Sequence, residues 1–324
     1  MGTRVSSNLW GVTVWDKKII WPEGKLFAFS IFDDTDLSTI NNVGPVYSFL
    51  KNNGILTTKS VWPIKGQQKP TIGGDTCENP EYLAWVKSLQ ADGFEIAFHN
   101  ATFHTSTREE TLRGLQKFHE YFGHWPRSMA NHADCRENIY WGQDRLTGLR
   151  KLLYNILTKG KRINFNRGHI EGDTLFWGDY CKKYITYVRN FVFDEINTLK
   201  QCPFMPYHDP QRPYVNFWFT STEGAKVQSF NSALSEKNQD RLEADGGACI
   251  MYTHFANSFC IDGRLDKRFE SLIGRLAKKS GWFVPVSTLL DYLKEHNGEH
   301  AITRAQKAML ERKWLWHKIK VGTT

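Results

Sequence analysis

The sequence alternates short apolar runs with amphipathic segments of helical period, and this alternation constrains the fold more than any other feature. The first apolar run covers residues 25–32 and ends in a pair of acids. A run without polar alternation is typical of a strand buried on both faces, as in parallel sheets covered by helices. Further strands are predicted at 55–62, 94–98, 163–165, 215–220, 248–253 and 282–284.

Helices are predicted between these strands from periodicity and from end signals. One begins after the cap residue Asn79, and another begins with Thr107 and Glu110 as a capping box and ends at Gly123. Other helices are predicted at 45–53, 143–157, 180–191, 234–244, 265–278 and 287–295. Repeated β-then-α units indicate an α/β fold whose parallel sheet is either doubly wound or closed as a barrel.

Composition sets the broad class of protein. The 324 residues are 40% hydrophobic and 23% charged, which suits one large α/β domain. The net charge is +8, but no zinc-finger, RNA-recognition or basic-zipper pattern accompanies it, so we expect no nucleic-acid partner. No stretch reaches the ~18–20 apolar residues of a membrane span. Residues 1–14 lack the pattern of a secretory signal, so we expect a cytoplasmic protein.

The last residues differ from the rest of the chain. We predict a single domain at 1–297 and a basic helical tail at 298–324. In this tail Met309, Trp316 and Ile319 fall roughly on one helical face, with Lys and Arg around them. Two interpretations stay open: peripheral contact with anionic lipid headgroups at a membrane, or docking on the domain through the aromatic side chains.

Acidic and imidazole side chains follow three of the predicted strands. They are Asp33, Asp34, Asp36, His99, His104 and His254. The carboxyl ends of parallel strands meet at one rim of the sheet, so these side chains are expected to converge. One Asp and two His can hold a divalent metal ion and leave positions open for water and substrate. A second carboxylate could take a proton from that water, and a further His could return one to the leaving group.

The order of these motifs resembles that of the polysaccharide deacetylases, the NodB-homology group of carbohydrate esterase family 4. Residues 30–35 (Ser-Ile-Phe-Asp-Asp-Thr) are similar to the family's T-F-D-D-G motif, and residues 95–104 are similar to its second motif with two His. Residues 249–254 are similar to its last apolar strand ending in His, and residues 283–292 to its final strand and helix. The resemblance spans about residues 23–296.

The resemblance implies a distorted (β/α) barrel of about seven parallel strands and a metal-dependent hydrolase. It assigns Asp33 as the general base, Asp34, His99 and His104 as ligands of one divalent metal, by default Zn²⁺, and His254 as the general acid. The implied reaction removes the N-acetyl group of an amino sugar in a glycan or glycolipid precursor.

The sequence departs from the family pattern in three places. The family's Gly-Pro after the paired Asp is absent, and the chain reads Thr35-Asp36 there. The second motif has one extra residue between its two His, and residues 128–134 stand where the family has an Arg-Pro-Pro motif. Asn131 and His132 in this segment, with Trp177 and Asp179 further on, are candidate substrate-binding residues. Structural roles are the alternative for each, a helix cap in the case of Asp179.

Two other functions stay open at this stage. The first is an amidohydrolase that acts on a small non-sugar amide. The second is a non-catalytic sugar-binding protein on the same fold, which the altered third motif keeps in consideration.

Overall fold

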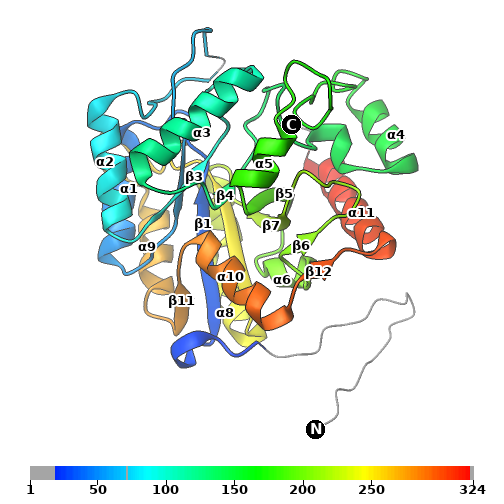
Figure 1. Cartoon of the computed structure of the whole chain (residues 1–324). Coiled ribbons are helices and arrows are strands. Elements are labelled where there is room, and N and C mark those ends of the chain that lie inside the picture. Colours follow the sequence, from blue (N-terminus) through cyan, green and yellow to red (C-terminus); the bar gives the residue numbers. More distant parts are fainter. Residues whose placement is uncertain (1–18, 71, 322–324) are drawn as a thin grey trace.

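Seven parallel strands close into a barrel in this computed structural model, which describes residues 19–70 and 72–321 (Figure 1). Each strand pairs with the next around the ring, and the last pairs with the first. In ring order they are β1 (Phe27–Asp33), β2 (Thr58–Val61), β3 (Glu95–Phe98), β4 (Ser128–Met129), β5 (Tyr187–Phe193), β7 (Phe217–Glu223) and β8 (Ala248–Thr253). The predicted distorted (β/α) barrel of about seven parallel strands is confirmed.

The distortion comes from short strands that attach outside the ring. β11 (Gly281–Phe283) pairs in parallel with the first half of β1, whereas β2 pairs only with its end. β6 (Tyr207–His208) runs antiparallel to β7, and β12 (His300–Ala301) pairs with β6. A separate hairpin consists of β9 (Cys260–Ile261) and β10 (Arg264–Leu265).

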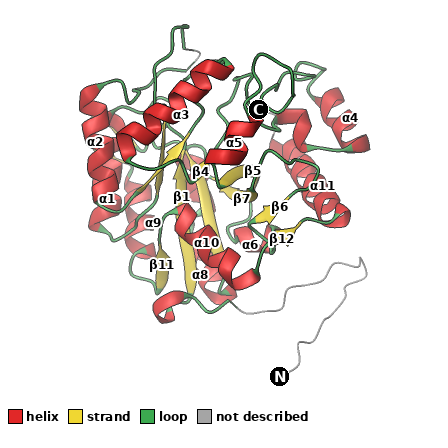
Figure 2. Ribbon diagram, viewed as in Figure 1, coloured by secondary structure: helices red, strands yellow, loops and turns green. Residues whose placement is uncertain are grey.

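Helices surround the strands, as the secondary-structure colours show (Figure 2). The α-helices are α1 (Ile40–Asn52), α2 (Pro80–Ala91), α3 (Arg108–Phe122), α4 (Gly148–Leu157), α5 (Gly178–Tyr184), α6 (Thr198–Gln201), α7 (Val227–Ala233), α8 (Glu236–Asp245), α9 (Lys267–Leu276), α10 (Val286–Asn297) and α11 (Arg304–Val321). Two 3₁₀ turns, η1 (Pro22–Gly24) and η2 (Gly142–Arg145), complete the elements.

The helix-end signals in the sequence are confirmed. The Asn79 side chain accepts hydrogen bonds from the first turn of α2. Thr107 and Glu110 form a reciprocal capping box at the start of α3. Gly123 ends α3 in the left-handed conformation (φ 77°), which glycine adopts without a steric penalty.

Three secondary-structure predictions were wrong, all between residues 143 and 191. The helix predicted at 143–157 is interrupted, because η2 ends at Arg145 before α4 begins. The strand predicted at 163–165 is a turn, and Asn164 has a left-handed φ of 51°. The helix predicted at 180–191 is α5 followed by β5. All seven residues of β5 are buried, and its aromatic and β-branched side chains suit a strand packed on both faces.

The C-terminal helix α11 packs on the barrel, against β5 and beside α4 (Figure 1). Its buried stripe contains Leu310, Trp314 and Leu315, whereas Trp316 and Ile319 are 60% and 46% exposed. Of the three residues predicted to share a face, Met309 packs against the core, whereas Trp316 and Ile319 turn outward. The structure shows that α11 docks on the barrel through an aromatic side chain, Trp314. Contact of the tail with a membrane, and the division of the chain into a domain and a tail at residue 297, stay predictions. No helix of the described residues has an apolar stretch long enough to cross a membrane.

The buried Glu311 explains which face of α11 turns inward. Its carboxylate accepts hydrogen bonds from Arg150 Nε at 2.7 Å and from the backbone N–H of Thr147 at 3.1 Å. These contacts hold a charged residue on the inner face and bring Trp314 and Lys318 of the same face to the barrel end that carries the functional side chains.

Candidate metal centre and active site

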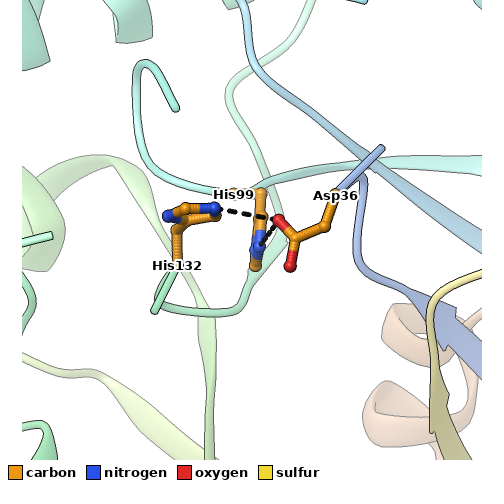
Figure 3. A group of neighbouring side chains, drawn as sticks. All are labelled: Asp36, His99 and His132. Carbon is orange, nitrogen blue, oxygen red and sulfur yellow. Dashed lines mark ion pairs between the residues drawn. The ribbon is translucent and has the colours of Figure 1, made fainter. Parts of the chain in front are cut away.

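Three side chains from three different strand ends converge at the carboxyl-terminal rim of the barrel (Figure 3). Asp36 comes three residues after β1, His99 directly follows β3, and His132 comes three residues after β4. Asp36 Oδ1 lies 2.9 Å from His132 Nε2 and 3.5 Å from His99 Nε2. We call these three residues the Asp-His-His cluster.

Hydrogen bonds on the far side of each ring orient the two imidazoles. His99 Nδ1 is 3.0 Å from the carbonyl oxygen of Ala130, so Nδ1 carries the proton and donates it. The lone pair of a neutral His99 ring is then on Nε2, which faces Asp36. His132 Nδ1 lies 3.3 Å from Cys135 Sγ, and burial raises the pKa of that thiol well above its usual range. The sulfur stays protonated and can accept weakly, which again leaves Nε2 of His132 facing the cluster.

The cluster fits a tetrahedral divalent metal. Its three facing atoms, Asp36 Oδ1, His99 Nε2 and His132 Nε2, are buried and none makes an aligned hydrogen bond. They lie within 4.8 Å of one another. Ligand atoms about 2.0–2.1 Å from a tetrahedral ion are roughly 3.3 Å apart, close to the observed separations. One carboxylate and two imidazoles form a ligand set that suits Zn²⁺ and leaves one of its four coordination positions open.

A fourth side chain, His254, follows β8 and contacts the same carboxylate. Its Nε2 lies 2.9 Å from Asp36 Oδ2, and its Nδ1 lies 3.1 Å from the carbonyl oxygen of Ala225. Burial alone would lower the pKa of His254, but the hydrogen bond and charge of Asp36 outweigh it and raise the pKa to about 9. Burial likewise opposes ionisation of Asp36, but the three imidazoles around it hold its pKa well below the usual range.

A second carboxylate, Asp34, stands beside the cluster. Its Oδ2 is 4.0 Å from His99 Nε2. Arg189, within β5, donates two hydrogen bonds to it, from Nη1 to Oδ1 at 2.8 Å and from Nη2 to Oδ2 at 2.5 Å. Both side chains are about 3% exposed. The two-point contact fixes the plane of the carboxylate and compensates its charge inside the barrel.

A cavity of about 320 Å³ opens beside these groups. Asp34, Asp36, His99 and His254 line it together with Asn131, and the rest of its wall includes residues of the 133–166 segment, β5, β8 and α11. The Asn131 side chain is held by the backbone of Ile139, which it contacts at both its oxygen and its nitrogen. Asn131, which was predicted to bind substrate, therefore lies on the cavity wall, and its side chain also has a structural contact with the Ile139 backbone.

The structure does not bring Asp33 to this cavity. Successive residues of a strand point to opposite sides, so Asp33 at the end of β1 points away from the side that Asp34 faces. Its carboxylate accepts hydrogen bonds from the Phe255 backbone N–H at 2.8 Å and from Tyr47 Oη at 2.9 Å, and forms an ion pair with Lys59 at 3.0 Å. Among the described residues, Asp33 is not one that lines the cavity.

His104 also lies outside the cluster. Its Nδ1 faces the carbonyl oxygen of Thr105 at 2.8 Å, and its Nε2 accepts from the backbone N–H of Gln68 at 3.2 Å. The ring fills the space that Gly66 leaves free, where any Cβ would collide with it. The ligand set inferred from the family pattern, Asp34 with His99 and His104, is thus not the set that the structure assembles. Asp36 and His132 are the residues that lie with His99.

Trp177 and Asp179 lie away from the cavity. Trp177 is fully buried, and its Nε1 donates to the carbonyl oxygen of Glu137. Asp179, in the first turn of α5, pairs with Arg108 at 2.6 Å on the surface. Neither residue lines the cavity among the residues that the structure describes, and the contacts of both are structural.

Arg189 was missed at the sequence level, although a signal was present. It is a charged residue within the otherwise largely apolar segment Tyr187–Phe193. A buried charge is costly unless a partner compensates it, so an Arg in such a strand indicates a buried carboxylate nearby.

Solved structures share this architecture. A protein from Mycobacterium smegmatis assigned as a polysaccharide deacetylase superposes with a TM-score of 0.51 at 13% identity, over 89% of this chain and 97% of that chain. The chain has the fold of the polysaccharide deacetylases. The peptidoglycan deacetylase PdaC from Bacillus subtilis has a TM-score of 0.39 at 10% identity, over 91% of this chain and 100% of that chain. No protein-family model and no curated protein matches the sequence.

Barrels of alternating strands and helices carry their functional groups where the strands end, which is where the Asp-His-His cluster, Asp34 and His254 lie. At 13% identity the likeness concerns the fold. The function therefore has to be argued from the side chains themselves.

Proposed function

We propose that the protein is a metal-dependent hydrolase that removes the N-acetyl group of an amino sugar, in a glycan or glycolipid precursor. One observation carries the proposal. The Asp-His-His cluster presents three unbonded ligand atoms at a cavity that also contains a fixed carboxylate, Asp34, and a protonated imidazole, His254. Amide hydrolysis at a metal needs these components: a metal site, a base and an acid.

Asp36, His99 and His132 would hold the metal, with Zn²⁺ as the ion that suits them. A metal in this place would polarise the amide carbonyl and lower the pKa of water. His99 and His132 contribute by presenting Nε2, because the hydrogen bond or contact at Nδ1 of each ring sets its orientation.

Asp34 is assigned here as the general base, in place of Asp33. It lines the cavity and lies 4.0 Å from a ligand atom of His99, whereas Asp33 is turned away. Arg189 is a positioning residue, because its two hydrogen bonds prevent the carboxylate from rotating. An acceptor at a fixed place beside the reacting water can take its proton without reorganisation.

His254 is assigned as the general acid. Its Nδ1 proton is held by the carbonyl oxygen of Ala225, and its Nε2 carries the proton that it donates to Asp36. An amine leaves a tetrahedral intermediate readily only when its nitrogen is protonated as the bond breaks. The Nε2 proton of His254 is available at the cavity for that step.

The experiment measures metal content and acetate release on the same samples. Protein purified without chelator is expected to carry about one divalent ion per chain and to release acetate from at least one sugar in a panel of N-acetylated amino sugars. Faster acetate release from small non-sugar amides would favour the amidohydrolase alternative. Sugar binding with no acetate release at full metal occupancy would favour a binding protein.

A further inference from the structure

Two basic side chains of the cavity wall have no carboxylate partner. Arg145, at the end of η2, is 5% exposed, and its Nε and Nη2 are buried without a hydrogen bond. Lys318, on α11, is 9% exposed and lines the same cavity. Within the described part of the chain, neither residue forms an ion pair with a carboxylate. Buried charges without partners are rare because their desolvation is costly.

Aromatic rings hold these two cations in place. The Arg145 guanidinium carbon lies 3.2 Å from the ring centroid of Trp141 and 5.1 Å from that of Trp314. Lys318 Nζ lies 6.0 Å from the ring centroid of Trp314. Cation–π contacts orient a cation but do not neutralise it. Since Trp314 and Lys318 both belong to α11, the C-terminal helix forms part of this wall.

Two other cations of the cavity wall already have carboxylate partners. Arg189 is paired with Asp34, and Arg162 with Asp134 at 2.6 Å. Glu223 lines the cavity as well, but its Oε1 accepts from the backbone N–H of Ala225. Among the described residues it forms no ion pair with Arg145 or Lys318. Glu223 therefore offsets part of this positive charge from a distance, and no ion pair in the part of the chain that the structure describes neutralises Arg145 or Lys318.

The titration behaviour of both groups agrees with an uncompensated positive charge. Burial lowers the pKa of the Arg145 guanidinium to about 9. Burial, and then the charge of Arg145, lower the pKa of Lys318, and the charge of Glu223 opposes this shift only in part. An anion bound between them would relieve both the desolvation cost and the mutual repulsion.

We propose that Arg145 and Lys318 form an anion subsite of this cavity, so that the substrate is an acidic sugar whose carboxylate or phosphoryl group binds there. The planar guanidinium offers paired N–H groups to two oxygens of one anion, and the ammonium group contributes a point charge. The binding of a simple oxyanion stands on the geometry alone. The identification of the ligand as a substrate group rests on the proposed function.

Calorimetric titration of the intact protein with inorganic phosphate and with glucuronate, at constant ionic strength, tests the subsite without any catalytic readout. At least one anion is expected to bind, and Arg145→Met is expected to weaken it about tenfold or more, since hydrogen bonds to charged groups contribute that much. Lys318→Met should weaken it as well. Lys320→Met is the matched control, because Lys320 is exposed on the same helix and does not line the cavity.

One further variant and a fold check make the outcome decisive. His99→Ala should bind the anion as the wild type does. If His99→Ala abolishes binding while Arg145→Met and Lys318→Met retain it, the anion occupies the metal centre and the subsite is refuted. No binding of either anion by the wild type also refutes it. Thermal denaturation verifies that each variant is folded, and Lys318→Met decides the matter if Arg145→Met is not.

Kinetics with a matched set of sugars then identifies the bound group. N-acetylglucosamine is neutral, its 1-phosphate carries a phosphoryl group, and an N-acetylhexosaminuronic acid carries a carboxylate. Arg145→Met should raise KM for the preferred anionic sugar about tenfold and leave the neutral sugar unaffected. Equal effects on neutral and anionic sugars would overturn the substrate assignment. If no sugar releases acetate, the proposed function fails, while the anion titration still decides whether the subsite exists.

Discussion

Arg189 and Asp34 meet across the barrel interior, although 155 residues separate them in the chain. Both side chains are about 3% exposed, and two parallel hydrogen bonds of 2.8 and 2.5 Å join them. The Arg189 guanidinium also lies 4.2 Å from the ring centroid of Tyr252. A strand on one side of the barrel thus sets the position of the carboxylate that follows a strand on the other side. The position of the Asp34 carboxylate in the site therefore depends on how the closed barrel places β5 opposite β1.

The first prediction concerns this pair. Arg189→Lys keeps the charge but loses the two-point contact, so the plane of the Asp34 carboxylate is no longer fixed. We expect kcat for acetate release to fall at least about tenfold, with little change in metal content, because a displaced base loses part of the ~10²–10⁴-fold effect of general base catalysis. Rates and metal content are measured on the same preparation.

A matched control is available at the surface. Arg108 makes the same kind of two-point contact with Asp179, at 2.7 and 2.6 Å, but away from the cavity. Arg108→Lys should leave kcat unchanged. If Arg189→Lys retains wild-type kcat, Arg189 has only a structural role.

The second prediction separates the metal ligands from the neighbouring groups. Asp36→Ala and His132→Ala should abolish the bound metal, because each removes one of three converging ligand atoms. Asp34→Asn should retain the metal and lose most of the activity, since an amide cannot accept the proton. His104→Ala should retain both. Metal loss in His104→Ala together with full occupancy in His132→Ala would restore the ligand set expected from the family pattern.

The strand ends could be predicted from the sequence, but the side on which each acid lies could not. Apart from Lys25 and Ser30 the run 25–32 is apolar, so it has no regular polar alternation from which to read which residues face the barrel interior. Whether Asp33 or Asp34 faces the cavity depends on that alternation. Family spacing favoured Asp33 as the base, and the pleat of β1 places Asp34 there instead.

Long-range neighbours explain the other differences. His104 and His132 both follow strands, and only the path of the loops decides which ring reaches Asp36. The loop after β3 turns His104 toward Gln68, whereas the loop after β4 brings His132 to 2.9 Å from the carboxylate. Arg145 and Lys318 approach the same Trp314 ring because α11 packs back on the barrel, and the sequence does not show which residues that packing brings together.

The third prediction concerns Asp33, whose contacts are structural. Asp33 and Lys59 form a fully buried ion pair at 3.0 Å. Asp33→Asn leaves the ammonium group buried without a counter-charge, so the free energy of unfolding should fall by about 3–5 kcal/mol. Adding Lys59→Met should recover much of that loss. Chemical denaturation measures both variants, and metal content should stay unchanged in whichever of them is folded.

The more exposed pair of Lys51 and Asp92, at 2.6 Å, provides the comparison. Asp92→Asn should cost less than about 1 kcal/mol, because solvent screens a surface pair. A folded, stable Asp33→Asn protein that lacks activity but keeps its metal would instead point to Asp33 as the base.

The fourth prediction rests on His169, a mostly buried imidazole between α4 and α5. Its Nδ1 accepts a hydrogen bond from the backbone N–H of Tyr140 at 3.2 Å, and its ring centroid lies 4.3 Å from that of Tyr140. Burial lowers the pKa of His169 to about 4; the charge of Asp144 opposes this shift and that of Arg212 adds to it. The folded protein therefore holds this side chain neutral at pH values where an unfolded chain would protonate it.

A lowered histidine pKa makes the folded state sensitive to acid. Between pH 6.5 and about 4 the unfolded chain binds a proton that the folded protein does not, so the contribution of His169 is complete above pH 6.5 and is lost as the pH falls toward 4. The loss is on the order of 3 kcal/mol. His169→Asn, which can still accept from the Tyr140 N–H, should reduce the fall in unfolding free energy between pH 7 and 4 by that amount, as measured by urea denaturation. His119→Asn, at an exposed position of α3, is the control, and an equal fall in His169→Asn and the wild type would contradict the assignment.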